Sequence, residues 1–225
     1  MHNLRSSDIV NNLDTYVYHI LGCGAIGSSA ATQLARMGAK HFALYDMDKV
    51  GVENVGVSQY SLDDIGVSKT ISLAKKLQDI DMDVDVMELD QKFTSILRYD
   101  QSSIAILGFD NMKTRLQAVE NMYLKNGPKM LIDGRMGAEH YQQYTFIGNN
   151  ILKEYKDSWY SDEEGSIEPC TAKATSYCSN MSGSFIVNAI RKDLTNQPYE
   201  KELVFNFPAM FLTKNTCFKY APIVN

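Results

Sequence analysis

Residues 22–27 read GCGAIG, a GxGxxG pattern between an apolar run at 16–21 and a run of small and apolar residues at 28–37. In a strand–turn–helix unit of this kind, the first glycine makes the tight turn, the second lets backbone approach a phosphate, and the third lets helix and strand pack closely. The start of the helix also offers free N–H groups and a positive dipole end to an anion. The stretch therefore predicts a nucleotide-binding βαβ unit rather than a glycine turn without function.

Outward from this turn, short apolar runs alternate with longer stretches of helical periodicity, as in parallel sheets built from βαβ units. The runs typical of strands are 41–45, 83–89, 103–107 and 130–132, and those typical of helices are 67–79 and 111–126. After Gly134 we expect a strand at 141–147 that need not be parallel, a polar loop at 148–169, a helix at 179–194 and short strands at 203–207 and 210–212. The sequence thus predicts one α/β domain over 1–225, with a Rossmann-like, doubly wound, mostly parallel sheet and antiparallel C-terminal strands.

The composition limits the class of protein. The 225 residues are 44% hydrophobic and 22% charged, which is enough to bury a core and excludes a disordered or fibrous chain. The net charge of −5 gives no basic field, so nucleic acid is not the expected partner. No apolar run reaches membrane-spanning length, no apolar leader opens the chain, and the four cysteines are widely spaced. We therefore expect a cytoplasmic protein with reduced thiols and no membrane association.

Charged residues beyond the glycine turn decide between two nucleotide chemistries. Asp46 ends the next predicted strand roughly 20 residues after Gly27, where an acid normally holds ribose hydroxyls. A dehydrogenase that binds NAD needs no further charges at the phosphate end. Here Lys69 and Asp110 are also predicted to converge there, and adenylation uses such groups, because acids hold Mg²⁺ and cations neutralise the charge developing on the α-phosphate and pyrophosphate.

The order of the motifs resembles one family. The ThiF/MoeB superfamily of adenylating domains, related to ubiquitin-activating enzymes, is similar in five successive stretches: GCGAIG at 22–27, LYDMD at 44–48, ENVGVSQY at 53–60, DIGVSK at 64–69 and GFDNMKTR at 108–115. The resemblance covers about 15–135, with a weaker echo near 180–194. The later stretches DGRMG at 133–137 and EPCTA at 168–172 look like a phage- or plasmid-associated ThiF-like branch.

The resemblance implies an ATP-dependent adenylyltransferase. Such an enzyme activates a C-terminal carboxylate, usually of a ubiquitin-like protein or peptide, as an acyl-adenylate with release of pyrophosphate. It implies ATP and Mg²⁺ as cofactors, Asp110 as the Mg²⁺ ligand, a homodimer, a nucleotide-binding core at about 15–135 and a crossover loop at about 148–170. The nucleotide-binding candidates are Gly22, Gly24, Ala25, Gly27, Asp46, Asp48, Asn54, Lys69, Asp110, Asn111 and Arg115. The catalytic candidates are Lys69, Asp110, Arg135 and Cys170.

Two departures from the family pattern bear on the site. In the family, the motif that corresponds to 53–60 usually supplies an arginine to the phosphates, and Val57 stands in its place here. Arg135, between Gly134 and Gly137 just beyond a predicted strand, is our candidate for the replacement cation; the alternative is a rim arginine in a structural salt bridge. Many members also carry two CxxC pairs that bind structural zinc, and since this chain has no CxxC we expect no zinc.

Cys170 has two interpretations. It closes the polar loop and precedes a helical segment, like the cysteine in relatives that form a thioester, and a nearby cation such as Lys173 would favour its thiolate. The alternative is a buried loop anchor, because cysteine also packs as a small hydrophobic side chain.

Three charged residues each allow two roles. Lys69 contacts phosphate or is simply solvated, Asp110 binds Mg²⁺ or caps the next helix, and Arg115 reaches phosphate or pairs with an acid. Two competing functions follow for the chain as a whole, an NAD(P)-dependent Rossmann oxidoreductase and a degenerate, non-catalytic ThiF-like binding protein.

Overall fold

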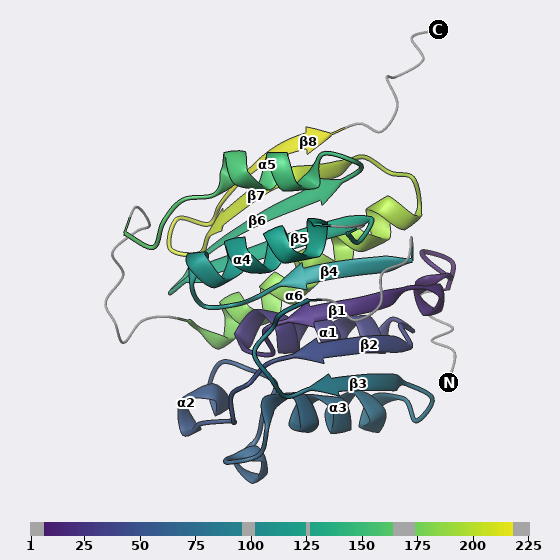
Figure 1. Cartoon of the computed structure of the whole chain (residues 1–225), viewed down its shortest axis with the longest axis vertical. Helices are drawn as coiled ribbons and strands as arrows, with labels where there is room; N and C mark the ends of the chain where they lie inside the picture. Colours follow the sequence, from purple (N-terminus) through teal and green to yellow (C-terminus); the bar gives the residue numbers. More distant parts are fainter. Residues whose placement is uncertain (1–6, 96–101, 125–126, 164–173, 218–225) are drawn as a thin grey trace, which may run out of the picture.

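The computed structural model describes residues 7–95, 102–124, 127–163 and 174–217. The described strands form one eight-stranded sheet in the order β3-β2-β1-β4-β5-β6-β7-β8 (Figure 1). Their bounds are β1 Val17–Leu21, β2 His41–Tyr45, β3 Asp85–Leu89, β4 Ser103–Leu107, β5 Met130–Gly137, β6 His140–Ile147, β7 Tyr199–Asn206 and β8 Phe211–Cys217. The pairs from β3 through β5 are parallel, and those from β5 through β8 are antiparallel. The predicted fold class is confirmed.

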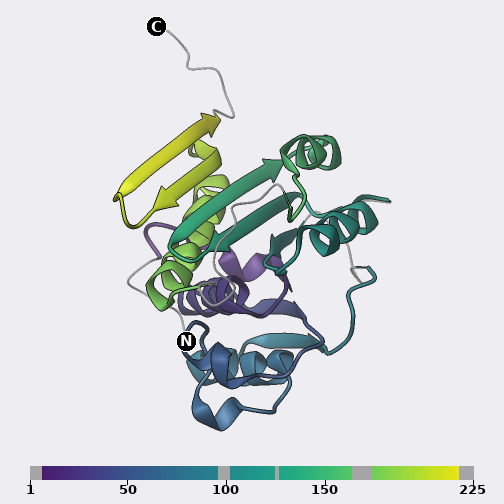
Figure 2. The ribbon, with the colours of Figure 1, turned by 90° about the vertical axis from the view of Figure 1, so that its left-hand side faces the viewer.

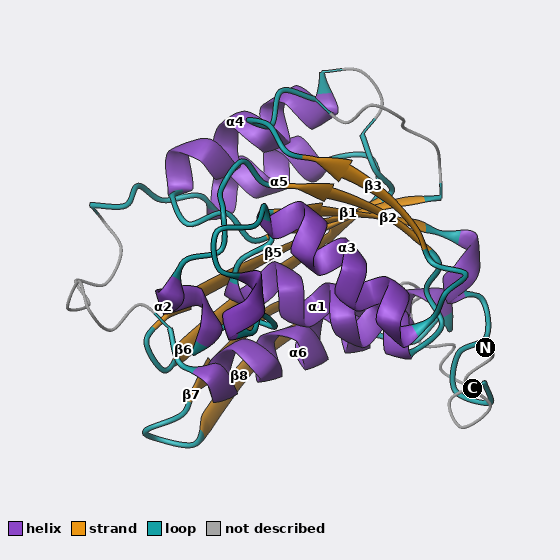
Figure 3. Cartoon of the chain, turned by 90° about the horizontal axis from the view of Figure 1, so that it is seen from below, coloured by secondary structure: helices purple, strands orange, loops and turns teal. Residues whose placement is uncertain are grey.

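Helices cover both faces of the sheet, as Figure 3 shows, with α1, α3 and α6 on one face and α4 and α5 on the other. Their bounds are α1 Ala25–Arg36, α2 Val52–Val55, α3 Lys69–Ile80, α4 Met112–Tyr123, α5 Ile151–Ser158 and α6 Ser176–Leu194. Two apolar cores result, one on each side of the sheet. The central strand β4 is buried throughout because both of its faces are covered, whereas β3 at the edge is mostly exposed.

The strand order reverses at β1, which has β2 on one side and β4 on the other. The chain leaves β1 for α1 on one face, and it leaves β4 for α4 on the opposite face (Figure 3). In open α/β sheets the ligand-binding crevice lies at such a reversal, which here is at the carboxyl ends of β1 and β4. The glycine-rich turn follows β1, and Asp110 follows β4, so both motifs lie at this crevice.

Several expected boundaries were wrong. The strands expected at 203–207 and 210–212 are the longer β7 and β8, and α6 begins three residues earlier than expected. Two further differences bear on the site. The segment 148–169, predicted as a loop, contains α5, because Ile151 and Tyr155 lie four residues apart and bury one stripe against the sheet while polar residues fill the rest. Strand β5 continues to Gly137, so Arg135 lies inside a strand paired with β6 rather than beyond its end. The long pairing of β5 with β6 supplies the hydrogen bonds that extend it.

The antiparallel strands form one end of the molecule. Figure 2 shows β7 and β8, in yellow-green and yellow, at the end opposite the blue segment that contains α2 and α3. Most of the described part of β8 is exposed, consistent with a position at the sheet edge. Among the described residues, no helix is long and apolar enough to cross a membrane.

Candidate functional site

The glycine-rich turn is shaped by two close backbone approaches. Gly22 has φ +96°, and a Cβ there would come within 2.8 Å of the Gly108 carbonyl carbon. A Cβ on Gly27 would lie only 1.9 Å from the Gly22 carbonyl oxygen. Both glycines are therefore required by the fold itself.

Gly24 differs from these two glycines. A Cβ at Gly24 would meet no protein atom within 4 Å, so protein packing does not explain this glycine. Gly24 is also the N-cap of α1, which begins at Ala25 without a side-chain cap. The arrangement leaves space and backbone N–H groups for a phosphate, as predicted for this turn.

Asp46, Asp48 and Lys69 form a charged group beside the turn. One Asp46 carboxylate oxygen accepts from the Cys23 backbone N–H at 2.8 Å, and the other accepts from the Asp48 N–H at 2.9 Å. The Lys69 ammonium lies 3.8 Å from Asp46 and 3.0 Å from Asp48. Burial raises the pKa of Asp46, and the Lys69 charge opposes this shift. The three predicted residues are thus brought together at the end of β2.

A residue without an assigned role holds this region together. The hydroxyl of Tyr60 is buried and donates to the Cys23 carbonyl at 2.6 Å, and it also lies 3.2 Å from the Lys69 carbonyl oxygen. It therefore links the glycine-rich turn to the start of α3. Burial of the ring raises the pKa of Tyr60, so the hydroxyl keeps its proton for these bonds. The only sequence signal for this residue was its place at the end of the motif at 53–60.

Asn54 is bonded to its own helix. Its side-chain oxygen accepts from the Gly51 N–H at 2.9 Å, which stabilises the start of the short helix α2. The position therefore has a local structural role beside the phosphate contact that was predicted for it. Val57, which stands where relatives have arginine, is half-buried two residues beyond α2.

Asp110 is available for a ligand. Asp110 is exposed, and among the described residues its side chain accepts a hydrogen bond from the Asn111 amide at 3.2 Å. The start of α4 is capped by Asn111, which accepts from the Thr114 N–H at 2.7 Å, and by Asp162, which accepts from the Met112 N–H at 3.0 Å. Since other residues cap this helix, capping does not account for Asp110.

Arg115 and Arg135 share one buried carboxylate that the sequence did not single out. Asp133 on β5 has no exposed surface, and its two oxygens accept from Arg115 on one side and from Arg135 on the other, the latter at 2.8 Å. Arg115 therefore pairs with an acid, one of the two predicted roles. The Asp133 charge and hydrogen bond raise the pKa of Arg135, although burial alone would lower it.

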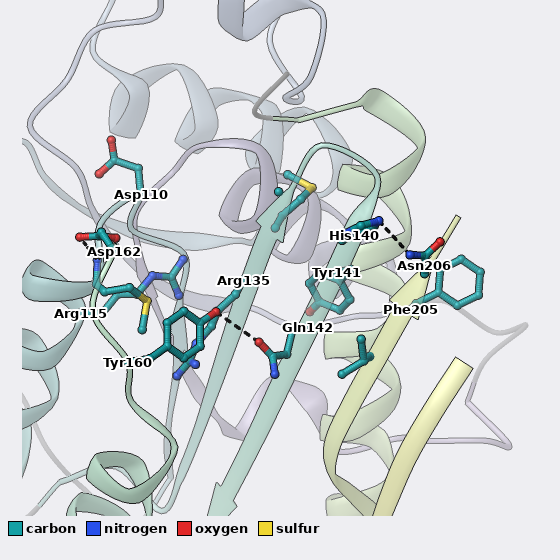
Figure 4. A pocket seen from close by; sticks show the side chains of 14 residues that line it. Asp110, Arg115, Arg135, His140, Tyr141, Gln142, Tyr160, Asp162, Phe205 and Asn206 are labelled. Atoms are coloured by element: carbon teal, nitrogen blue, oxygen red, sulfur yellow. Dashed lines mark hydrogen bonds between the residues drawn. The ribbon is translucent and has the colours of Figure 1, made fainter. Parts of the chain in front are cut away.

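The arginines line a pocket of about 390 Å³ beside Asp110 (Figure 4). Its walls come from β5, β6, β7, the start of α4 and the segment after α5. Across it, the Tyr160 hydroxyl bonds the Gln142 side chain at 3.3 Å, and His140 lies 2.8 Å from the Asn206 amide. Pockets of this size with a few convergent polar groups are typical of ligand sites.

The two cysteines whose side chains the structure describes, Cys23 and Cys178, are both buried. Cys23 is fully buried, and burial raises the pKa of its thiol. Cys170 and its proposed activating neighbour Lys173 lie outside the described residues. Among the described residues, no group of three or more histidine, cysteine or acidic side chains is arranged to hold a metal ion.

Comparisons with known proteins agree with this geometry. A model of the ThiF family matches residues 3–221. Ubiquitin-like modifier-activating enzyme 5 of Aedes aegypti is 32% identical over 87 residues, which are 39% of this chain and 22% of that protein. The same enzyme of Drosophila pseudoobscura pseudoobscura is 33% identical over 108 residues, which are 47% of this chain and 27% of that protein. The chain thus spans roughly a quarter of the length of these relatives.

Solved structures share the fold at low identity. Escherichia coli MccB, solved with ATP, has a TM-score of 0.70 and 15% identity over 96% of this chain and 67% of that chain. Selenomethionine PaaA has a TM-score of 0.69 and 15% identity over 94% of this chain and 76% of that chain. These likenesses establish a common architecture over nearly the whole chain.

Proposed function

Because this chain belongs to the ThiF family, we propose that it is an ATP-dependent adenylyltransferase that activates the C-terminal carboxylate of a peptide or ubiquitin-like protein. One observation supports this proposal above the others. The Asp46–Asp48–Lys69 group and Asp110 flank the crevice where the strand order reverses, and a pocket with two arginines opens beside Asp110. A nucleotide and a second, acidic reactant would therefore have adjoining sites.

The glycine-rich turn fits ATP in its local chemistry. The open space at Gly24 and the uncapped start of α1 suit a phosphate. Asp46 keeps a carboxylate at the end of β2, where ribose hydroxyls bind in folds of this class. MccB has been solved with ATP, and this chain shares its architecture. We therefore place the nucleotide across the carboxyl ends of β1 and β2.

Asp110 is the residue that would hold Mg²⁺. Magnesium is usually bound through one or two carboxylates together with substrate phosphates and water, rather than by a cage of protein ligands. A single exposed carboxylate at the crevice fits this requirement. When bound there, the ion would screen the phosphate charges that otherwise repel an incoming carboxylate.

The proposed reaction joins the two reactants directly. A carboxylate oxygen of the substrate attacks the α-phosphorus, the new P–O bond forms, and the bond from that phosphorus to the β-phosphate breaks to release pyrophosphate. Lys69 neutralises charge that develops on the phosphates, and its position at the first residue of α3 beside Asp46 suits this role. The acyl group and the residues that precede it in the substrate chain would occupy the pocket beside Asp110.

We assign the cation that replaces the missing motif arginine to Arg135. It lines the same pocket as Asp110, and its charge is retained because Asp133 raises its pKa. Val57 provides no cation at the usual place. The homodimer, and a thioester at Cys170, remain expectations from the family resemblance alone.

The test is isotope exchange between pyrophosphate and ATP. The purified chain is incubated with Mg²⁺, ATP and a library of octapeptides with free C-terminal carboxylates, and a C-terminally amidated library serves as the control. Exchange that needs the free carboxylate is expected. Calorimetry with NAD(H) runs in parallel, and NAD(H) binding without ATP binding or exchange would instead favour the oxidoreductase.

A further inference from the structure

Asp133 links two arginines inside the fold. Arg115 donates from α4 to one Asp133 oxygen and at 2.9 Å to the Gly134 carbonyl. Arg135 donates its Nε–H to the other Asp133 oxygen at 2.8 Å, and at 3.1 Å it donates to the Ser158 carbonyl at the end of α5. Asp133 has no exposed surface, and both arginine side chains are 6% exposed. We call these three residues the arginine–aspartate cluster.

The charge of the cluster is unbalanced. One arginine would neutralise Asp133, so the second leaves one net positive charge in a buried place, where an uncompensated charge is costly. Buried ion pairs are also weak stabilisers compared with apolar side chains of similar size. Stability therefore gives no reason for the second arginine, whereas an oxyanion bound in the pocket would balance the charge.

The Arg135 guanidinium is held firmly in the pocket wall. Its Nη2 lies 2.8 Å from Asp133 but makes no well-aligned hydrogen bond, although it is buried. The guanidinium packs against the rings of Tyr144 and Tyr160, with its centre 4.5 and 4.8 Å from the ring centroids. Figure 4 shows Arg135 close to Tyr160 in the wall of the pocket. Its orientation is thus fixed before any ligand arrives.

The two other acids of the pocket do not neutralise the cluster. Asp162 accepts from the Met112 N–H at the start of α4, and Asp110 accepts from the Asn111 amide. Among the described residues, neither forms an ion pair with Arg115 or Arg135.

We infer that Asp133 is a positioning residue, which holds the guanidinium groups of Arg115 and Arg135 so that their excess positive charge binds the oxyanion at the reacting centre. This inference rests on the proposed function. The oxyanion is either the carboxylate of the substrate or the α-phosphate of the nucleotide, and both present the same paired oxygens to a guanidinium. Asp133 touches neither reactant and acts through the arginines.

The first test measures anion binding without catalysis. Thermal unfolding is followed in sodium acetate, methyl phosphate or chloride at equal ionic strength, because a ligand that binds only the folded state raises the melting temperature. Acetate or methyl phosphate should stabilise the wild-type chain more than chloride does. The salt whose effect is lost in Asp133→Asn identifies the source of the oxyanion, because phosphate bound at the glycine-rich turn would still stabilise that variant. Asp133→Asn should lose this extra stabilisation. Equal shifts in all three salts for the wild-type chain would overturn the inference.

Two further variants keep this test decisive. Arg115→Met leaves Arg135 paired with Asp133 and no net buried charge, so it should fold even if Asp133→Asn does not, and it should also lose the anion effect. Asp193→Asn is the matched control, because Asp193 is a buried carboxylate paired with Lys129 at 3.0 Å outside the pocket. Retention of the anion effect in Arg115→Met, or its loss in Asp193→Asn, would contradict the inference.

The second test uses the exchange reaction with the octapeptide library. Asp133→Asn should lower kcat/KM for the free-carboxylate peptides about 10- to 100-fold, the range expected for losing a hydrogen bond to a charged group. Asp133→Glu should recover part of this loss, and Asp193→Asn should leave it unchanged. Wild-type kinetics in Asp133→Asn would refute the positioning role while leaving the proposed function intact. Failure of the wild-type chain to catalyse exchange would instead count against the proposed function, and the thermal test would still decide anion binding.

Discussion

The strands β3, β2, β1 and β4 form the part of the sheet that we call the parallel half; β5, which also pairs with β4 in parallel, is counted with the other half. In the parallel half the polar groups lie at strand ends, within motifs that can be recognised in the sequence. Asp46 directly follows β2, Cys23 lies in the glycine-rich turn, and Lys69 begins α3. The three residues meet at the crevice. In the half that runs from β5 to β8, the polar groups lie inside the structure. Asp133 and Arg135 project from β5, and Arg115 reaches them from α4.

The two halves differ in how much their charged residues affect the free energy of unfolding. Asp48 and Asp110 are exposed, and charges near solvent contribute little to stability, so substitutions at these two residues should change chemistry and leave the fold intact. The arginine–aspartate cluster is buried, so substitutions there should change stability first. The following predictions test this comparison.

The largest expected effect is on stability, from Asp133→Ala. Removing the shared carboxylate leaves two buried guanidinium groups unpaired, and breaking a buried pair typically costs about 3–5 kcal/mol. Urea unfolding measures the loss. A variant as stable as the wild-type chain would show that the cluster is solvated, and the contrast between the two halves would fail.

Next come Lys69→Ala and Asp110→Ala, which we expect to lower exchange activity by about 10²–10³-fold, as for other single electrostatic contributors to a transition state. The urea midpoint of Asp110→Ala should stay close to the wild-type value, because Asp110 is exposed. Lys69→Ala should also lose some stability, because the Lys69 side chain is only 11% exposed and lies beside the Asp46 carboxylate, which is 9% exposed. Lys113→Ala serves as the control, because Lys113 lies in the first turn of α4, three residues after Asp110. Wild-type exchange rates in either variant would remove that residue from the mechanism.

Gly27→Ala and Gly24→Ala form a pair within the parallel half. The added methyl at position 27 would lie 1.9 Å from the Gly22 carbonyl oxygen, so we expect about 1–3 kcal/mol of destabilisation from overpacking. At position 24 it meets no protein atom within 4 Å, so the loss should appear in ATP affinity instead. Thermal melting and calorimetry separate the two effects, and the reverse pattern would refute the assignment of Gly24.

Tyr60→Phe removes the hydroxyl that links the glycine-rich turn to α3 and leaves the Cys23 carbonyl without this donor. We expect a loss of about 0.5–1.5 kcal/mol, the usual net value of one hydrogen bond. A drop in ATP affinity should accompany it, because the turn is held less firmly. Unchanged melting and unchanged affinity together would show that this link is unimportant.

The smallest effect on stability is expected for Asp46→Asn. Burial raises the pKa of Asp46 in the folded state, so its ionisation disfavours folding as pH rises through that pKa. The wild-type chain should therefore lose stability relative to the Asp46→Asn variant as pH rises from 4 to 7. The variant also carries a small loss at every pH, because both Asp46 oxygens accept backbone N–H groups and an amide has only one acceptor oxygen. ATP affinity should fall nevertheless. A variant less stable at pH 7 than at pH 4, relative to wild type, would contradict this sign.

Much of the parallel half could be predicted from the sequence. The strands at 41–45 and 103–107 match the structure residue for residue, and the glycine turn lies where its pattern placed it. The reason is that a strand, a glycine turn and a helix N-terminus are determined by neighbours within a few residues. Lys69 and Asp46 come together because Asp46 directly follows β2 and Lys69 is the first residue of α3.

The other half could not be predicted in the same way. Helix α5 was hidden because only two of its eight residues are buried, and a polar helix resembles a loop until it has a surface to pack on. Asp133 was overlooked as a site residue because the strand was expected to end at residue 132, and nothing in the local sequence indicates which cations the acid meets. Its importance appears only when the extended β5 and helix α4 bring two arginines to it.

The sequence by itself determined the fold class, the glycine-rich turn and the charged residues around the crevice, since these depend on local periodicity and on motif spacing. Only the tertiary structure decided that Arg115 and Arg135 share a carboxylate and line a pocket together with Tyr160. Those contacts join segments that are distant in the chain, and their energy depends on burial, which exists only once the sheet and its helices have assembled.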